Sequence, residues 1–191
     1  MIFGKAKTIV FKVKCMSNQT IVIRDAMSSE FSLVGQLMVE VYAGLKGFPK
    51  PTEQPAYYKM LSAVGELTLK PDTALRVAVL NDGTIAGAVV YFGDMQYYGS
   101  GGTATQEKNS AGFRLLAVNP EFRGGGIGKL LTLDCIQRAK AQRRVQMIIH
   151  TTMAMRTAWA MYEKLGFQRS VDLDFMQGEL AVFGFRLPLN A

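Results

Sequence analysis

The residues best suited to chemistry lie in one glycine-rich segment, Val118–Lys129, which reads VNPEFRGGGIGK. A proline marks a turn after a short apolar stretch, and three consecutive glycines then lead into apolar residues with helical spacing. Glycines allow backbone N–H groups to approach a ligand closely, and the first turn of a helix adds unpaired N–H groups and a positive dipole end. The segment therefore predicts an anion site suited to a pyrophosphate. The alternative is a set of glycines that only turn the chain.

Two well-known phosphate-binding patterns do not match this segment. A P-loop would need glycine where Arg123 stands and serine or threonine where Leu130 stands. The dinucleotide pattern G-x-G-x-x-G would need glycine in place of Lys129 or Leu131, depending on which glycine begins it. The sequence therefore excludes both of these loop types here.

A different pattern, R/Q-x-x-G-x-G/A, does fit and is filled by Arg123, Gly126 and Gly128. A Leu-x-Val strand end precedes it, and a Tyr-x-x-x-Gly-Phe pattern follows at Tyr162–Phe167, after a further helix and strand pattern. With both motifs at this spacing, the chain resembles the GNAT superfamily of acyl-CoA-dependent N-acyltransferases. The resemblance is specific over residues 116–167 and extends in architecture over residues 20–187.

The resemblance implies an acetyl-CoA site along this motif. The backbone of the strand end would pair with the pantetheine arm, and the glycine-rich loop would hold the pyrophosphate. Strands ending at Val118 and near His150 would splay apart to admit the arm and thioester, with a backbone N–H facing the thioester oxygen. The cofactor-binding residues expected on this basis are Leu116, Ala117, Val118, Arg123, Gly124, Gly125, Gly126, Ile127, Gly128 and Lys129.

Two further side chains are candidates for catalysis. The resemblance places Tyr162 where the family commonly has a general acid for the departing CoA thiolate, whereas its periodicity alone would suit a core tyrosine. His150, the single histidine, stands at a strand end where some members place a glutamate as general base. With an unperturbed pKa of about 6.5 it could deprotonate an amine. The alternative for His150 is a strand-end residue without a catalytic role.

The sequence also departs from the family pattern. Met155 stands where many members have an asparagine that bonds the pantetheine, so that contact is absent or is made by Thr151 or Thr152. The stretch before the loop has no carboxylate that could act on the acceptor amine. Glu107 and Asp94 are the remaining weak candidates for that role, although each suits a solvated position.

The residue patterns on either side of these groups predict the strands and helices that must position them. A hairpin with an Asn-Asp-Gly turn joins two of the strands, because these residues suit positive backbone angles. The strands expected from β-branched and apolar runs are Thr20–Asp25, Leu75–Leu80, Ile85–Phe92, Phe113–Val118, Val145–His150 and two more within Phe167–Leu187. The helices expected from apolar spacing are Glu30–Tyr42, capped by Ser28 or Ser29, then Ala56–Val64, one that begins near Ile127, and Arg156–Leu165.

This order predicts a mixed α/β fold. The order also places helices on both faces of the sheet. The resemblance to the GNAT superfamily implies a mostly antiparallel sheet of six to seven strands with splayed fourth and fifth strands. At 191 residues, 49% of them apolar, the chain suits one domain over residues 17–191. Residues 1–16 would form an arm that is dispensable if the protein starts at Met16.

Composition narrows the remaining possibilities. No run approaches the roughly 20 apolar residues of a membrane span. Cys15 and Cys135, with one histidine, cannot supply a disulfide framework or a structural zinc site, so we expect reduced thiols, a cytoplasmic location and no metal. The net charge of +7 is spread along the chain, and its density is too low to argue for a nucleic-acid partner.

We therefore predict acetyl transfer from acetyl-CoA to a primary amine by direct attack in a ternary complex. The alternative is a non-catalytic acyl-CoA-binding sensor on the same fold. The acceptor, a small molecule or a peptide, depends on the segments Glu30–Val64 and Gly93–Gly112, which are rich in aromatic residues but carry no decodable motif. A homodimer stays an open alternative.

Overall fold

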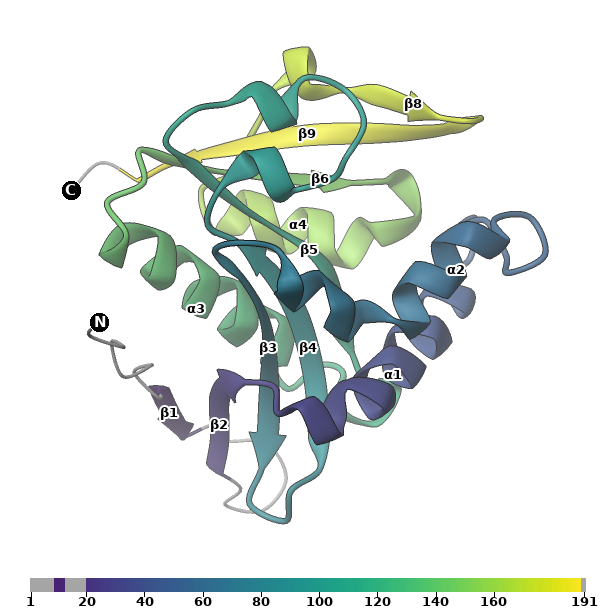
Figure 1. Ribbon diagram of the computed structural model, residues 1–191, viewed down its shortest axis with the longest axis vertical. Coiled ribbons are helices and arrows are strands. Elements are labelled where there is room, and N and C mark those ends of the chain that lie inside the picture. Colours follow the sequence, from purple (N-terminus) through teal and green to yellow (C-terminus); the bar gives the residue numbers. More distant parts are fainter. Residues whose placement is uncertain (1–8, 13–19, 190–191) are drawn as a thin grey trace.

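The computed structural model describes residues 9–12 and 20–189, and its centre is a mixed sheet between two layers of helices (Figure 1). Within these residues the strand order is β1-β2-β3-β4-β5-β6-β9-β7, with β8 paired to β9, and every pair is antiparallel except β5 with β6. The strands are β1 (Ile9–Lys12), β2 (Thr20–Asp25), β3 (Thr73–Leu80), β4 (Ile85–Phe92), β5 (Ser110–Val118), β6 (Gln146–Thr151), β7 (Gln168–Arg169), β8 (Phe175–Gln177) and β9 (Leu180–Pro188).

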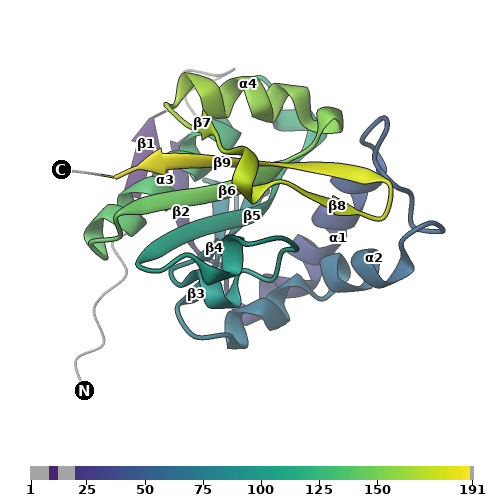
Figure 2. The ribbon, with the colours of Figure 1, turned by 90° about the horizontal axis from the view of Figure 1, so that it is seen from above.

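In the described part of the chain, four α-helices cover the two faces of the sheet. They are α1 (Phe31–Ala43), α2 (Pro55–Ser62), α3 (Ile127–Ala141) and α4 (Arg156–Lys164). Figure 2 shows α4 above the sheet and α1 and α2 below it, with the β8–β9 hairpin reaching out over the side where α1 and α2 lie. The mixed, mostly antiparallel α/β fold expected from the sequence is confirmed. β1 is added to the expected strands, and residues 167–188 form three strands (β7, β8 and β9) where two were expected.

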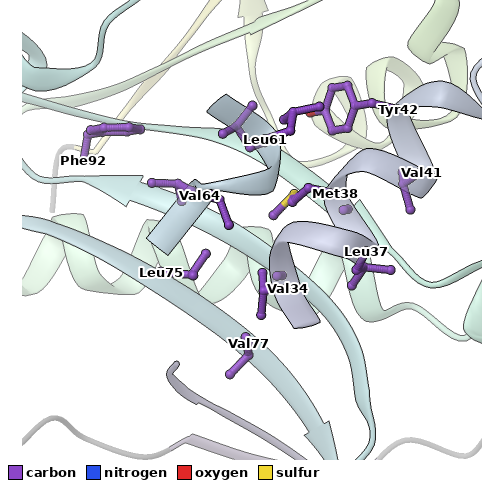
Figure 3. Close-up of a cluster of buried hydrophobic side chains, with 14 of the residues drawn as sticks. Val34, Leu37, Met38, Val41, Tyr42, Leu61, Val64, Leu75, Val77 and Phe92 are labelled. Atoms are coloured by element: carbon purple, nitrogen blue, oxygen red, sulfur yellow. The ribbon is translucent and has the colours of Figure 1, made fainter. Parts of the chain in front are cut away.

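Each helical layer closes its own hydrophobic core. Apolar residues at helical spacing on α1, among them Val34 and Met38, pack with Leu61 and Val64 onto the face of β3 that carries Leu75 (Figure 3). On the opposite face, side chains of α3 and α4 pack against alternate residues of β4, β5 and β6. The sheet is therefore buried on both sides, which explains its nearly continuous apolar strands.

The parallel pair β5–β6 opens into a fork. Its partners are Ser110 with Gln146, Ala111 with Met147, and Gly112 with Ile148, and the pairing ends there. Beyond that point β5 stays paired only with β4 and β6 stays paired only with β9. The splayed strands expected from the sequence are thus present, as β5 and β6.

A β-bulge distorts β5 next to the fork. Ala88 of β4 pairs with Ala117 and Val90 pairs with Arg114, so two residues of β5 lie opposite Val89. One of them, Leu115, has a φ of 58°, in the left-handed region that non-glycine residues rarely adopt. The bulge therefore changes the direction of the backbone amides where the two strands separate.

A buried ion pair ties the sheet to α3. Arg76 of β3 donates from Nε and Nη2 to the carboxylate of Asp134 at 2.7 and 2.9 Å, and both side chains are 3% exposed. Arg76 also donates to Asp25 at 2.8 Å. The carboxylate of Asp134 can be buried because the arginine that satisfies it comes from a distant strand.

Two other predictions concern the N-terminal end: the cap of α1, which was wrong, and the arm, most of which lies outside the described residues. Neither Ser28 nor Ser29 caps α1, and instead the Glu30 carboxylate accepts the Met27 N–H at 2.7 Å and pairs with Arg24. The proposed arm, residues 1–16, is described only at Ile9–Lys12, which adds an edge strand to β2. Cys15 and Met16 lie outside the described residues.

The described part of the chain has no helix with both the length and the apolar character needed to cross a bilayer. Within the same residues, no three His, Cys, Asp or Glu side chains group as metal ligands would.

Candidate active site

A cavity of about 490 Å³ lies at the fork, between β5, the start of α3 and α4. It gathers most of the residues selected from the sequence: Leu116, Val118, Arg123, Gly124, Gly126, Ile127, Gly128, Lys129, His150 and Tyr162. Ala117 and Gly125 do not line it, and Ala117 is buried in the core on the α1 side. Met155 lines the cavity as well.

The glycine-rich loop has the backbone expected of an anion site. Gly124 and Gly126 have φ values of 81° and 80°, which only glycine adopts without strain. Gly126 is the N-cap of α3 and no side chain caps the helix, so the first N–H groups of α3 face outward without a side-chain partner. Arg123 and Lys129 are exposed beside them, and neither pairs with a carboxylate in the described residues. The loop is therefore suited to hold a pyrophosphate.

Gly128 shows that this cradle depends on a missing side chain. A Cβ at Gly128 would lie 3.5 Å from Val118 Cγ2 and 3.8 Å from Met161 Sδ, which are ordinary contacts. All three residues line the cavity. A longer side chain at Gly128 would thus enter the cavity without straining the protein, and glycine keeps the space open for a ligand.

The fork leaves one edge of β5 without a strand partner. Beyond Gly112 the backbone on the β6 side has no ladder, while the other side is bonded to β4 as far as Val118. A free strand edge offers N–H and C=O groups to an extended ligand. The amides of a pantetheine arm fit this edge.

Tyr162 reaches the cavity from α4 and is 5% exposed. Its ring packs against Phe113 and Phe167 at centroid distances of 5.7 and 5.8 Å. Within the described residues its hydroxyl has no hydrogen-bond partner, and burial raises the pKa of Tyr162 well above its usual value. The phenol is therefore protonated at neutral pH and can donate its hydrogen into the cavity.

His150 stands at the fork with both ring nitrogens in contact. Nε2 lies 3.0 Å from the carbonyl oxygen of Leu173, which can only accept, so Nε2 carries the hydrogen. Nδ1 lies 3.2 Å from the hydroxyl of Tyr98. Burial, aided by the charge of Arg114, lowers the pKa of His150 to about 4. The unperturbed pKa expected from the sequence is therefore wrong, because segments distant in sequence bury the ring.

A second cavity, of about 70 Å³, adjoins the first. Both are lined by Tyr42, Arg114, Leu115, His150 and Met155, so they meet at the bulge of β5. Its other walls come from α2, β6, β8, β9 and neighbouring loops, and its lining includes Phe48, Tyr57, Thr151, Thr152, Phe175, Gln177, Leu180 and Val182. The sequence pointed to this side only through the aromatic content of two segments.

The threonines and carboxylates considered from the sequence lie in different places. Thr151 and Thr152 line the second cavity and not the first. Neither Glu107 nor Asp94 lines either cavity. Glu107 pairs with Arg186 and accepts from Gln146 at 3.0 Å, and Asp94 accepts the N–H of Gln96 at 3.0 Å. Both carboxylates thus serve local structure.

Arg114 is the site residue that the sequence reasoning missed. In the sequence Arg114 interrupts an apolar strand, and a charged residue at such a position needs either a partner, as Arg76 has in Asp134, or a ligand. The residues that complete its surroundings come from the C-terminal hairpin, whose position no local pattern reveals.

Comparisons with known proteins show the family and the fold of the chain. The acetyltransferase (GNAT) family profile matches residues 37–167. The chain is 34% identical over 65 residues to mycothiol acetyltransferase from Saccharomonospora viridis, a match over 34% of this chain and 21% of that relative. The match therefore spans about a fifth of the length of that protein.

Solved structures match over most of the chain. A GNAT-family acetyltransferase from Staphylococcus aureus Mu50 has a TM-score of 0.68 at 17% identity, covering 89% of this chain and 99% of that one. A phosphinothricin acetyltransferase from Sinorhizobium meliloti, solved with acetyl-CoA, has a TM-score of 0.61 at 20% identity, covering 88% of each chain. At these identities the likeness is one of fold.

Proposed function

The chain belongs to the acetyltransferase (GNAT) family, and on this basis we propose that it transfers an acetyl group from acetyl-CoA to a primary amine by direct attack in a ternary complex. One observation carries the proposal. A single cavity joins the glycine-rich start of α3, the unpaired edge of β5 and the hydroxyl-bearing ring of Tyr162. These are the groups needed for a pyrophosphate, an extended amide arm and a leaving thiolate.

The binding roles follow the lining of the cavity. N–H groups from Gly124 to Lys129 would hold the pyrophosphate, with Arg123 and Lys129 supplying positive charge. The backbone of Leu116 and Val118 would pair with the amides of the pantetheine arm. Ala117 and Gly125 do not line the cavity, so they would act only by holding the neighbouring residues in place.

The bulge would serve the chemical step. We assign a backbone N–H at Leu115 or Leu116 as the donor to the thioester oxygen, where negative charge develops as the amine attacks. A donor placed there in advance is worth roughly 3–4 kcal/mol of barrier. The bulge explains how a strand bonded to β4 can still turn such an N–H toward the fork.

The proton balance of the reaction indicates which side chain acts at each step. The amine nitrogen forms the new C–N bond and the C–S bond breaks. Tyr162 donates its phenolic hydrogen to the departing sulfur. The nitrogen loses one proton to solvent, and the phenolate of Tyr162 takes one proton from solvent, which restores the phenol. Acetyl-CoA and an amine thus give an amide and the free thiol.

His150 would act as a neutral acceptor near the amine. With a pKa of about 4, its ring is uncharged at neutral pH, and Nδ1 keeps a lone pair. The Tyr98 hydroxyl that faces Nδ1 also lies 3.3 Å from the carbonyl oxygen of Phe113, so its hydrogen can move there. We propose that Nδ1 then accepts a hydrogen bond from the attacking amine.

Binding at the loop is tested by thermal unfolding with acetyl-CoA. Ligand that binds only the folded protein raises its stability, so the wild type should show a rise in Tm that grows with acetyl-CoA concentration. Gly128→Leu fills the cradle and should abolish the rise. Lys140→Leu, at an exposed position of the same helix, is the control and should keep it. An unchanged wild-type Tm at millimolar acetyl-CoA would contradict the assignment.

The non-catalytic acyl-CoA sensor is the second candidate. Met155 favours the sensor. Its thioether lines both cavities at the position where many family members have an asparagine that bonds the pantetheine arm. A sensor would bind acetyl-CoA and release no thiol with any amine. The cytoplasmic location and a dimeric state remain predictions.

A further inference from the structure

We infer that the second cavity binds an acceptor whose amine stands a few bonds from a carboxylate, and that Arg114 holds this carboxylate. The inference deepens the proposed function, because it rests on the acceptor entering beside the thioester. The class it names is free amino acids with an apolar side chain, as opposed to polyamines or peptide N-termini.

The side chain of Arg114 is held in place by one of its nitrogens. Nη1 donates to the carbonyl oxygens of Tyr98 and Gly99 at 2.8 and 2.6 Å. The guanidinium carbon lies 5.5 Å from the centroid of the Tyr98 ring. Nε and Nη2 make no hydrogen bond to the described residues, so two donors of a fixed guanidinium remain for a ligand.

Arg114 is also without a counter-ion in the described part of the chain. It is partly buried, and every other buried or partly buried arginine there has a carboxylate within 4.0 Å. Those paired residues are Arg24, Arg76, Arg138, Arg144, Arg169 and Arg186. A partly buried charge without a partner is costly. Arg114 is the exception, and it lies where the two cavities meet. This position points to a ligand that carries the missing negative charge.

A separate observation marks the same cavity as a ligand site. The side chains of Thr151 and Thr152 are in residues 2% and 4% exposed, and both line the cavity. Their hydroxyl oxygens have no hydrogen-bond partner among the described residues. Buried hydroxyls are normally satisfied, so two neighbouring exceptions indicate a polar ligand that supplies the partners.

The charges around both cavities disfavour a polycation. Within the described residues, no Asp or Glu lines either of them, and Arg114 and Arg156 remain once Arg123 and Lys129 are assigned to the pyrophosphate. A Cβ at Gly99 would lie 3.5 Å from Arg114 Nη1 and 3.6 Å from Lys70 Nζ, so a second cation stands close to Arg114. A polyamine would meet repulsion here, and a carboxylate would meet attraction.

The geometry limits how far the two groups of the acceptor stand apart. Arg114 directly precedes Leu115, the bulge residue at the fork where the amine must attack. Amine and carboxylate therefore have to be close in the acceptor, as in an α-amino acid. The remaining walls are largely aromatic and aliphatic, from Tyr42, Phe48, Tyr57, Phe175, Leu180 and Val182, so the rest of the acceptor is apolar.

The test uses matched probes in a thiol-release assay: L-leucine, L-leucinamide and 3-methylbutylamine, and the phenylalanine series in parallel. Wild-type kcat/KM should favour the acid over its amide by about 10–100-fold, the effect of a charge-assisted bidentate contact. The amide has the less basic amine, so amine ionisation works against this preference. Arg114→Gln should reduce the ratio to near one, and because the ratio compares two acceptors in the same variant, a general loss of activity cancels from it. Arg143→Gln, an exposed arginine outside both cavities, is the control and should keep the ratio.

A binding measurement separates this inference from the proposed function. In saturating acetyl-CoA, or CoA where turnover interferes, L-leucine or L-phenylalanine should raise the Tm of the wild type and of Arg143→Gln, but not of Arg114→Gln. Stabilisation that depends on Arg114 without thiol release would refute acetyl transfer and leave the carboxylate site standing. Turnover of amines that is indifferent to a carboxylate and to Arg114, or a preference for polyamines, would overturn the inference.

Discussion

The hydroxyl of Tyr98 lies 3.2 Å from Nδ1 of His150, on the side of the ring opposite the carbonyl of Leu173. Tyr98 is fully buried, and burial raises its pKa well above the usual value, so the hydroxyl keeps its hydrogen. The contact therefore joins two neutral groups. It makes the single histidine a fixed, uncharged part of the wall between the two cavities, and this has consequences at low pH and in catalysis.

Burial of His150 should make the protein sensitive to acid. Its pKa is about 4 in the folded protein and about 6.5 when unfolded, so between these pH values the unfolded chain binds the extra proton. The free energy of unfolding should then fall as pH drops from 6.5 to 4, by up to about 3 kcal/mol from this group. Arg114 and Asp174 are the charged groups that act on the ring, with opposite signs.

Denaturant unfolding of wild type and His150→Gln at several pH values measures this contribution. The variant should lose less stability than the wild type as pH falls through this window. Parallel curves for the two proteins would show that His150 has no depressed pKa.

The same pKa predicts the pH profile of acetyl transfer. His150 is already neutral above pH 5, so it cannot supply an ionisation between about 6 and 8, and a rise of kcat/KM there belongs to the acceptor amine. His150→Gln should lower kcat/KM but retain this limb. If the limb disappears in the variant, His150 titrates in that range and acts as a general base.

Tyr162 carries the proposed general acid. Tyr162→Phe keeps the ring against Phe113 and Phe167 and removes only the hydroxyl. Acetyl transfer should fall by about 10²–10⁴-fold, while the rise in Tm with acetyl-CoA stays. Tyr58→Phe is the matched control, because that hydroxyl donates to the carbonyl of Pro49 at 2.8 Å, away from both cavities. Equal turnover in the two variants would remove Tyr162 from the reaction.

The buried pair of Arg76 and Asp134 should dominate stability among the charged contacts. Asp134→Asn leaves a buried guanidinium without its main partner and should lower the free energy of unfolding by about 3–5 kcal/mol. Asp172→Asn, which alters an exposed pair with Arg186, should have a much smaller effect. Similar denaturant midpoints for the two variants would show that the buried pair is dispensable.

The sequence was sufficient to predict features that depend on the spacing of neighbouring residues. The loop from Arg123 to Gly128, the helix after it and the Tyr162 motif depend on neighbouring residues, and the structure brings them to one cavity. The order of strands and helices likewise predicted the mixed fold, and the resemblance to the GNAT superfamily implied the fork.

Features that depend on distant segments could not be predicted in this way. The pKa of His150 is set by burial beneath residues near Leu173, and the carboxylate of Asp134 is satisfied by Arg76 from another strand. The second cavity needs the C-terminal hairpin, which pairs with β6 through β9 and brings Phe175 into the same lining as Thr151. No local pattern carries that information.

Thiol release from acetyl-CoA over a panel of amines and amino acids, with the product identified by mass spectrometry, tests the central claim most directly. Acetyl transfer predicts that wild-type protein releases one thiol for each acetylated acceptor formed, and that Tyr162→Phe lowers both together. Acetyl-CoA that raises the Tm of the protein but yields neither thiol nor acetylated product with any acceptor would contradict it.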